Sequence, residues 1–286
     1  MCPESIPGFK ISLIMDAAFQ RRVQRYGWDK AANCYEDFWH EQLRPPQDLL
    51  LDMLDLNRGE KVLDIAAGTG LVSFRAAEIV GENGFVLGTD ISEKMVAIAN
   101  DIAREKRYRN IVFSRMDAEQ LEIDEDSFDA AMCALGLMYV PDPLKALREM
   151  HRALKPGGRT GAAVWGQRDH CGWAGTFDII ERRVVSEVCP MFFNLGNPNQ
   201  LALYFKAAGY SNIKSETIST KLIYASDDEA CGAAFPGGPM ALAYNKFNDD
   251  MKAEVYAEYL DSIKQYKNGA GYELPGEFVV AIGTKP

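Results

Sequence analysis

The chain has 286 residues, of which 47% are hydrophobic and 25% are charged, a composition typical of a globular protein with one large or two small domains. Its 41 acidic residues outnumber the 31 basic ones and give a formal net charge of −10. Nucleic-acid binding depends on clustered Lys and Arg, so this balance argues against a nucleic-acid partner. The densest basic run, 104–109, falls where a helix is expected to end, and cations are stabilising there.

The six cysteines include no C-x-x-C pair, which favours free thiols over a disulfide framework or a zinc site. Cys133 and Cys189 lie in apolar stretches and are expected in the core. The first ten residues lack the apolar stretch of a secretory signal, and the longest apolar run, 130–140, is too short to span a bilayer. The sequence therefore predicts a cytoplasmic protein with no membrane span and no bound metal.

The segment before residue 56 has a helical pattern rich in aromatic side chains, and it is interrupted at Pro45 and Pro46. Trp28 and Tyr35 are seven residues apart, a spacing that would put them on one face of a single helix. With Tyr26 they would either close a lid over a ligand or simply pack together. We expect a helical lid at 1–55 and the main domain at 56–286.

From residue 61 onward, strand-like and helix-like segments alternate. Ser92 and Asp142 are suitable N-caps, and Pro143 strengthens the second of these helix starts. Gly81 and the glycines of "KPGG" at 155–158 are suited to ending helices. Strands are predicted at 61–66, 84–90, 110–117, 127–135 and 159–166, with helices between them at 71–81, after Ser92 and after Asp142.

After residue 166 the pattern loosens, although helices are still indicated at 173–188 and 199–209. Residues 213–225 alternate between apolar and polar, which is typical of an antiparallel strand, and a last strand is expected at 276–286. An insertion with helical character lies between these strands, at about 227–270. The alternation of strands and helices predicts an α/β, Rossmann-like fold with a mostly parallel sheet and helices on both faces.

Small and acidic residues follow one predicted strand after another, and ligands of open α/β sheets bind at this carboxyl edge. "DIAAGTG" begins at Asp64, Asp90 ends the second strand, and Asp117 ends the third. Glycines allow a backbone to approach a ligand closely, and the acids can accept hydrogen bonds from ribose hydroxyls and an adenine amino group. The glycines of this turn do not complete the dinucleotide motif G-x-G-x-x-G, and an acid in the turn would hinder a pyrophosphate.

The chain resembles the class I S-adenosylmethionine-dependent methyltransferases, and within them the ubiquinone/menaquinone biosynthesis C-methyltransferases. The matching stretches are "VLDIAAGTG", "GTDIS-KM", "RMDAEQL", "D-SFDA", "REMHRALKPGG" and the closing strand, so the resemblance covers roughly 50–166 and the last ten residues. The resemblance implies a seven-stranded sheet whose last strand is antiparallel, with S-adenosyl-L-methionine as the cofactor.

The resemblance also implies a role for individual residues at the cofactor site. The turn would hold the methionine portion, Asp90 with the adjoining Ile91 would bind the ribose, and Asp117 with Ala118 would bind the adenine. Gly136 would line the sulfonium side, and the lid would contribute Trp28 and Tyr35. The turn residues in this set are Asp64, Ala66, Gly68 and Gly70.

On the substrate side, His170 follows the fifth strand and is the best candidate for a general base. The nearby aromatic residues would either wall an apolar pocket or belong to the core; they are Trp165, Trp173, Phe177, Phe192 and Phe193. The function expected is methyl transfer to a small molecule, at a hydroxyl oxygen or an activated ring carbon. An N-methyltransferase, or a non-catalytic protein that binds the cofactor and a protein partner, is the alternative. A homodimer is also a possible state.

Overall fold

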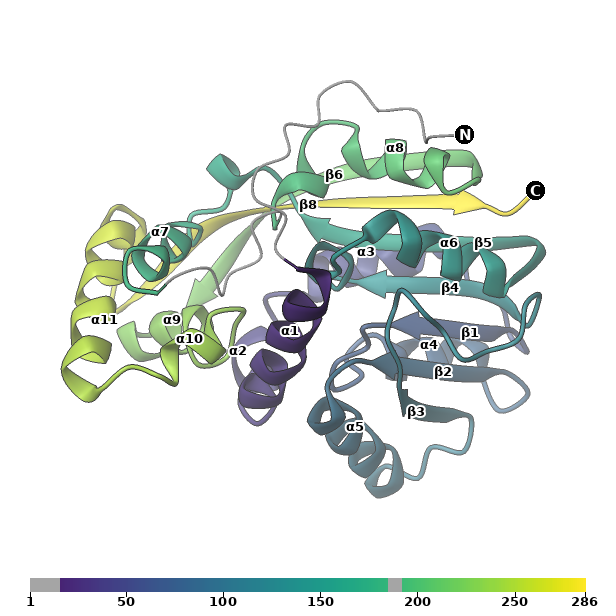
Figure 1. Ribbon diagram of the computed structural model, residues 1–286, viewed down its shortest axis with the longest axis horizontal. Coiled ribbons are helices and arrows are strands. Elements are labelled where there is room, and N and C mark those ends of the chain that lie inside the picture. Colours follow the sequence, from purple (N-terminus) through teal and green to yellow (C-terminus); the bar gives the residue numbers. More distant parts are fainter. Residues whose placement is uncertain (1–15, 185–191) are drawn as a thin grey trace.

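The computed structural model describes residues 16–184 and 192–286 and contains one central sheet (Figure 1). The strand order is β3-β2-β1-β4-β5-β8-β6, and β8 runs antiparallel to both of its neighbours while the other pairs are parallel. This confirms the predicted Rossmann-like fold with its antiparallel last strand. The strands are β1 (Lys61–Ile65), β2 (Phe85–Asp90), β3 (Ile111–Arg115), β4 (Phe128–Ala134), β5 (Leu154–Trp165), β6 (Ser211–Tyr224), the short β7 (Lys267–Asn268) paired with β8, and β8 (Gly271–Thr284).

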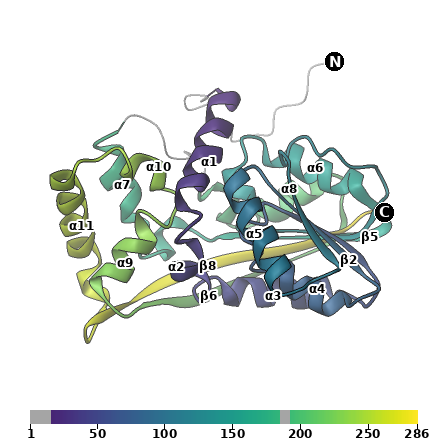
Figure 2. The ribbon, with the colours of Figure 1, turned by 90° about the horizontal axis from the view of Figure 1, so that it is seen from below.

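Helices cover both faces of the sheet, as predicted (Figure 2). Helices α3 (Arg44–Leu54) and α4 (Ser73–Val80) lie on one face, and α6 (Pro143–Ala153) and α8 (Gln200–Ala207) lie on the other. Helix α5 (Glu93–Glu105) packs along β2 and β3. The two predicted caps are confirmed, because Ser92 accepts a hydrogen bond from the backbone N–H of Met95 and Asp142 accepts one from that of Lys145.

The core forms where these helices meet the central strands. Leu50 and Leu54 of α3 are fully buried against β5. A Cβ atom at Gly161 of β5 would lie 2.6 Å from Leu50 Cδ1 and 3.0 Å from Leu54 Cγ, so only glycine lets α3 pack this closely. Cys133 of β4 is fully buried, as expected, whereas Cys189 lies outside the described residues.

From residue 16 onward, the N-terminal segment forms two helices before α3: α1 (Ala17–Ala31) and α2 (Tyr35–Trp39). The interruption predicted at the two prolines is the start of α3, where a missing N–H costs least. Helix α1 packs against α5 on one side and α10 (Ala241–Tyr244) on the other, so it bridges the sheet and the outer helices (Figure 1).

The predicted insertion is carried by β6 and β8, which extend together beyond the other strands (Figure 1). It comprises α9 (Asp227–Ala234), α10 and α11 (Asp249–Ile263), and α7 (Gly175–Glu181) packs against α11. Phe235 stacks on Tyr244 and Tyr256 at ring-centroid distances of 5.7 and 5.5 Å, which gives the insertion an aromatic core of its own.

Three boundaries differ from the predictions. Strand β8 begins at Gly271 rather than 276, because its first residues pair with the end of β6. Strand β5 begins at Leu154, which pairs with Phe128, and "KPGG" bulges out before Arg159 resumes the pairing with Ala130. Helix α7 is shorter than the predicted 173–188, and 185–188 lie outside the described residues. Within the described ranges, no helix has the length and apolar character needed to cross a membrane.

Gly70 provides a test of the packing beneath the turn that follows β1. Gly70 has φ +94°, and a Cβ there would lie 2.7 Å from Phe74 and 2.8 Å from Phe113, whereas Gly59 has φ +87° and open space around it. Gly59→Ala is expected to cost about 1–2 kcal/mol from backbone strain alone. Gly70→Ala should cost about 1–3 kcal/mol more because it overfills the core. Urea unfolding of both variants measures the difference, and equal free energies of unfolding would contradict this packing account.

Candidate functional site

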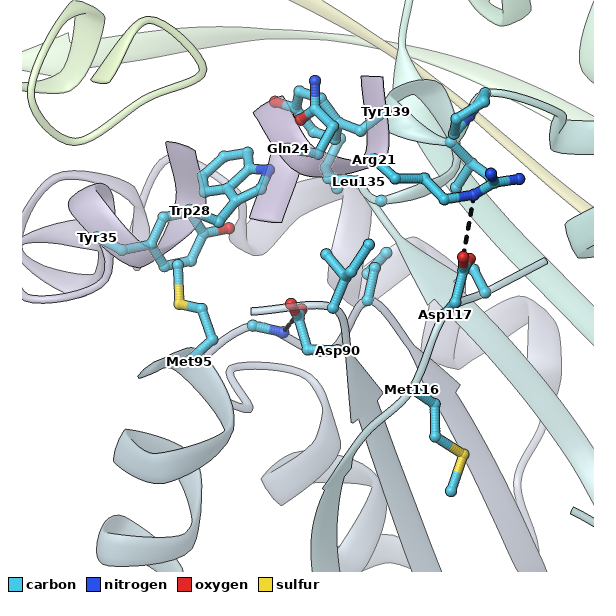
Figure 3. A pocket seen from close by; sticks show the side chains of 18 residues that line it. Arg21, Gln24, Trp28, Tyr35, Asp90, Met95, Met116, Asp117, Leu135 and Tyr139 are labelled. Atoms are coloured by element: carbon cyan, nitrogen blue, oxygen red, sulfur yellow. Dashed lines mark hydrogen bonds and ion pairs between the residues drawn. The ribbon is translucent and has the colours of Figure 1, made fainter. Parts of the chain in front are cut away.

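A cavity opens at the carboxyl edge of the sheet, the usual place for a ligand in an open α/β fold (Figure 3). Its floor is made by residues that follow β1, β2, β3 and β4 in turn, and its roof by helices α1 and α2. The lining residues are Arg21, Gln24, Trp28, Tyr35, Ala66, Gly68, Asp90, Ile91, Met95, Met116, Asp117, Ala118, Ala134, Leu135, Gly136, Tyr139, Val140 and Pro141.

The turns after β1 and β4 approach each other closely at this cavity. Ala66 and Gly68 have positive φ angles of 55° and 59°. A Cβ atom at Gly136 would lie only 2.3 Å from the Cβ of Ala66, so glycine is required where these turns meet. The result is a stretch of exposed backbone along the cavity floor.

Asp90 connects this floor to the second strand. Its side chain is buried, and its Oδ2 accepts a hydrogen bond from the N–H of Gly68 at 2.9 Å while Oδ1 accepts one from Ser92 at 2.8 Å. Burial raises the pKa of Asp90 to about 6 despite these donors. The carboxylate thus shapes the first turn and also faces the cavity.

Asp64 does not line the cavity but lies beneath the first turn, fully buried. Ser73 donates a hydrogen bond to its Oδ2, and its Oδ1 is buried with no hydrogen-bond partner among the described residues. Burial, with a further contribution from Asp90, raises the pKa of Asp64 to about 7. A buried acid with an oxygen that has no partner suits a cationic ligand group nearby.

Asp117 is held by the lid. Arg21 of α1 places its Nε 3.0 Å from Asp117 Oδ2 (Figure 3). Arg21 also pairs with the buried Glu119. The other oxygen of Asp117 accepts the N–H of Glu119 at 2.9 Å. Each carboxylate oxygen has two lone pairs, so Asp117 keeps capacity for a ligand donor. This ion pair fixes α1 over the adenine side of the predicted site.

Three aromatic rings close the opposite end of the roof. Trp28 lies between Tyr35 and Tyr139, with ring-centroid distances of 5.7 and 5.1 Å (Figure 3). The expectation that Trp28 and Tyr35 share one helix is wrong, because α1 ends at Ala31 and Tyr35 begins α2; the two rings meet across the intervening turn. Tyr26 is 48% exposed and does not line this cavity.

A smaller cavity, here called the aromatic annex, adjoins the first and shares four of its residues. Trp165 and Trp173 line it while remaining almost fully buried. These two residues therefore wall a cavity and also belong to the core. Phe177 and Phe192 pack behind Trp173 at centroid distances of 5.6 and 5.7 Å, and Phe193 lies at 5.9 Å. The annex is lined by Trp28, Tyr35, Trp39, Leu43, Leu135, Tyr139, Trp165, Trp173 and Pro239.

His170 lies outside the linings of both cavities, on the short turn after β5. Its side chain is half-exposed, and its Nδ1 is 2.6 Å from Oε2 of the buried Glu277 on β8. Glu277 Oε1 accepts the N–H of Gln167 at 2.9 Å. The carboxylate therefore fixes the imidazole and the turn that carries it.

Nine of the eleven predicted cofactor residues thus line one cavity, and Asp64 and Gly70 lie outside the lining. The sequence does not single out Arg21, Gln24 or Tyr139. The signal available for the first two is helical spacing, since Arg21, Gln24 and Trp28 recur at i, i+3 and i+7 along α1. Tyr139 follows the end of β4, where ligand contacts are expected because ligands bind at the carboxyl ends of the strands.

Known proteins with similar sequences are methyltransferases. Residues 56–164 match the model of a methyltransferase domain. A demethylmenaquinone methyltransferase of Listeria welshimeri is 33% identical over 135 residues, which cover 47% of this chain and 57% of the relative. A ubiquinone/menaquinone biosynthesis C-methyltransferase of Idiomarina loihiensis is 42% identical over 110 residues, covering 38% and 44%. The chain therefore spans about half the length of these curated relatives.

The fold extends beyond the matched region. A phosphoethanolamine N-methyltransferase of Haemonchus contortus, solved with S-adenosylhomocysteine, superposes with a TM-score of 0.62 at 20% identity and covers 96% of this chain and 61% of its own. At that identity the likeness concerns the fold. With the matched domain and the relatives, residues 56–164 are a class I S-adenosylmethionine-dependent methyltransferase domain, and the chain resembles the ubiquinone/menaquinone biosynthesis C-methyltransferase branch of that family.

Proposed function

We propose that the protein methylates a small molecule, at a hydroxyl oxygen or an activated ring carbon, with S-adenosylmethionine as the methyl donor. The observation that carries this proposal is the continuity of two cavities. One is floored by the strand-end residues expected for an adenosyl ligand, and the other is the small, mostly aromatic annex that shares four lining residues with it. The name of the Idiomarina loihiensis relative, a C-methyltransferase, favours a carbon acceptor.

The residues present fit the cofactor. Asp90 would accept from the ribose hydroxyls, and Asp117 from the adenine amino group. The unpaired oxygen of buried Asp64 supports a cationic methionine portion above the first turn. The close approach of Ala66 and Gly136 leaves the backbone of both turns open to the ligand. The bound cofactor supplies an electrophilic methyl group on a sulfonium.

The chain itself contributes positioning and exclusion of water. Trp28, Tyr35 and Tyr139 line both cavities, so they would surround the point where donor and acceptor meet. The annex favours an enzyme over a non-catalytic cofactor-binding protein, which would have no need of a second cavity beside the cofactor. Its lining has no carboxylate that would hold a protonated amine, so it favours an oxygen or carbon acceptor over a nitrogen.

Unpaired cysteines support a cytoplasmic location for the protein. Cys133, Cys171 and Cys231 are buried and unpaired, and Cys34 is half-buried and unpaired. Free thiols persist in reducing compartments. We therefore retain the cytoplasm as the proposed location.

Incubation with methyl-labelled S-adenosylmethionine tests the function. The purified protein is given quinols, phenols, cyclic polyols and amines in separate reactions. Label is expected in an oxygen- or ring-carbon-methylated product of one of the first three classes. Transfer to amines alone would support the N-methyltransferase alternative. Cofactor binding without transfer to any class would support the non-catalytic one.

His170 remains the candidate general base, now with Glu277 as the residue that orients it. His170→Ala is expected to lower kcat by about 10²–10⁴-fold, the usual contribution of general acid–base catalysis. Cofactor affinity should barely change, because His170 does not line the cofactor cavity. Arg168→Ala, on the same turn, is the matched control and should leave kcat near that of the wild type. A loss below about threefold for His170→Ala would assign the transfer to positioning alone.

The buried acids predict opposite pH dependences for stability and binding. The folded, cofactor-free protein keeps protons on Asp64 and Asp90 that the unfolded chain has lost above its ordinary pKa of 3.8. Its free energy of unfolding should therefore fall as pH rises from about 4 to about 7. Affinity for the cationic cofactor should rise over the upper part of the same range, because the ionised acids attract it.

Asp64→Asn should flatten both profiles between pH 6 and 7.5, as measured by urea unfolding and by calorimetric titration. Asp129→Asn is the control, because its ion pair with Lys155 holds the pKa of Asp129 below its usual value, and it lies far from the cavity lining. Profiles of Asp64→Asn that overlay those of the wild type would contradict the assignment.

A further inference from the structure

Helix α1 stands between α10 and α5 and roofs the cofactor cavity, but it lies outside the main hydrophobic core (Figure 2). Its two buried apolar residues, Val23 and Ala31, are not among the residues of that core. A Cβ atom at Gly27 would lie 3.7 Å from the Cβ of Leu242, so α1 packs closely on α10 at this point. The core therefore does not by itself keep α1 over the cavity.

Polar side chains join α1 to three strand ends at the cavity. After β2, the hydroxyl of Ser92 donates a hydrogen bond to Oδ1 of Asp29 at 2.6 Å. After β4, the carbonyl oxygen of Tyr139 accepts one from Nε2 of Gln20 at 3.4 Å. After β3, two acids pair with Arg21. The roof is thus held to the floor of the cavity by hydrogen bonds and ion pairs.

Glu119 makes the contact after β3 costly to break. Its side chain is only 2% exposed, and Arg21 is the one cation that pairs with it among the residues that the structure describes. The other carboxylate oxygen of Glu119 accepts the N–H of Asp142 at 2.9 Å, at the start of α6. If α1 moved away, Glu119 would remain buried without its positive partner, which is strongly unfavourable.

A second ion pair of the same helix provides a contrast. Arg25 places its Nη2 3.4 Å from Oε2 of Glu93, whose side chain is 74% exposed, and exposed pairs of this kind contribute little. Glu119 also differs from Asp117, because Asp117 lines the cofactor cavity and Glu119 does not. A change at Glu119 therefore alters the hold on α1 without removing a group that faces the ligand.

We propose that Arg21 and Glu119 form a latch that keeps α1 closed over the cavity, and that the ligand enters and leaves when this ion pair breaks. Glu119 is a positioning residue, because it acts on the ligand only through Arg21 and α1. The latch is closed with or without ligand, so it slows entry and exit alike and leaves the affinity nearly unchanged. That the ligand is S-adenosylmethionine rests on the proposed function; the latch itself does not.

Hydrogen exchange of the cofactor-free protein tests the latch alone. A detached helix of 15 residues is marginally stable in water, so the backbone N–H groups of α1 exchange when the latch opens. Glu119→Gln keeps the shape of the side chain and its acceptor for Asp142 but removes the charge. It is expected to speed exchange across α1 by at least about tenfold, as is Arg21→Gln. Exchange in α3, which is buried in the core, should stay the same and shows that the fold is intact.

Arg25→Gln is the matched control, since it removes an ion pair from the same helix, and exchange across α1 should stay within about twofold of the wild type. Exchange of α1 that is unchanged in both Glu119→Gln and Arg21→Gln would overturn the proposal.

The exchange of S-adenosylhomocysteine tests the effect of the latch on the ligand. Its dissociation rate is measured by chasing tritiated ligand with unlabelled ligand, and its affinity by calorimetry. Glu119→Gln should raise the dissociation and association rates together by at least about tenfold, with Kd within about threefold of the wild type. Faster dissociation with an equal loss of affinity would overturn the latch. Failure of the wild type to bind the ligand would instead overturn the proposed function, and hydrogen exchange would still decide the latch.

Discussion

The site depends on the buried carboxylate of Asp90. It accepts one backbone N–H from the turn after β1 and another from the start of α5, at Gly68 and Ser92. Ser92 in turn bonds through its hydroxyl to Asp29 of the lid helix at 2.6 Å. One side chain at the end of β2 thus connects the cavity floor, the adjoining helix and the roof, and a change there alters all three.

The Asp90 carboxylate also explains why the site lacks a balancing positive charge when no cation is bound. Asp64 and Asp90 are both buried, and each raises the cost of ionising the other. Arg21 lies in the same cavity but is paired with Asp117 and Glu119 at its far side. Negative charge under the first turn is therefore uncompensated by the described protein, as a site for a positively charged ligand requires.

The pattern of strands and helices in the sequence predicts where many of the site residues lie. The strand-end residues Asp90, Asp117 and Gly136 follow from the alternation of strands and helices, because parallel strands end at one edge. The contacts of α1 and of the annex do not follow, because they join segments far apart in sequence. Arg21 reaches Asp117 across 96 residues, and the ring of Trp173 contacts that of Trp39, which precedes it by 134 residues. Trp28 and Tyr35 line the cavity, but from two helices and not from the single helix that their spacing predicts.

Calorimetric titration of S-adenosylmethionine, and separately of NAD, tests the central claim most directly. The account predicts saturable one-site binding of S-adenosylmethionine and no binding of NAD, because the acids under the first turn would oppose a pyrophosphate. It also predicts that Asp90→Ala weakens binding by about 1.5–3 kcal/mol or more, the contribution of hydrogen bonds to a charged group. Tight binding of NAD with none of S-adenosylmethionine would contradict it.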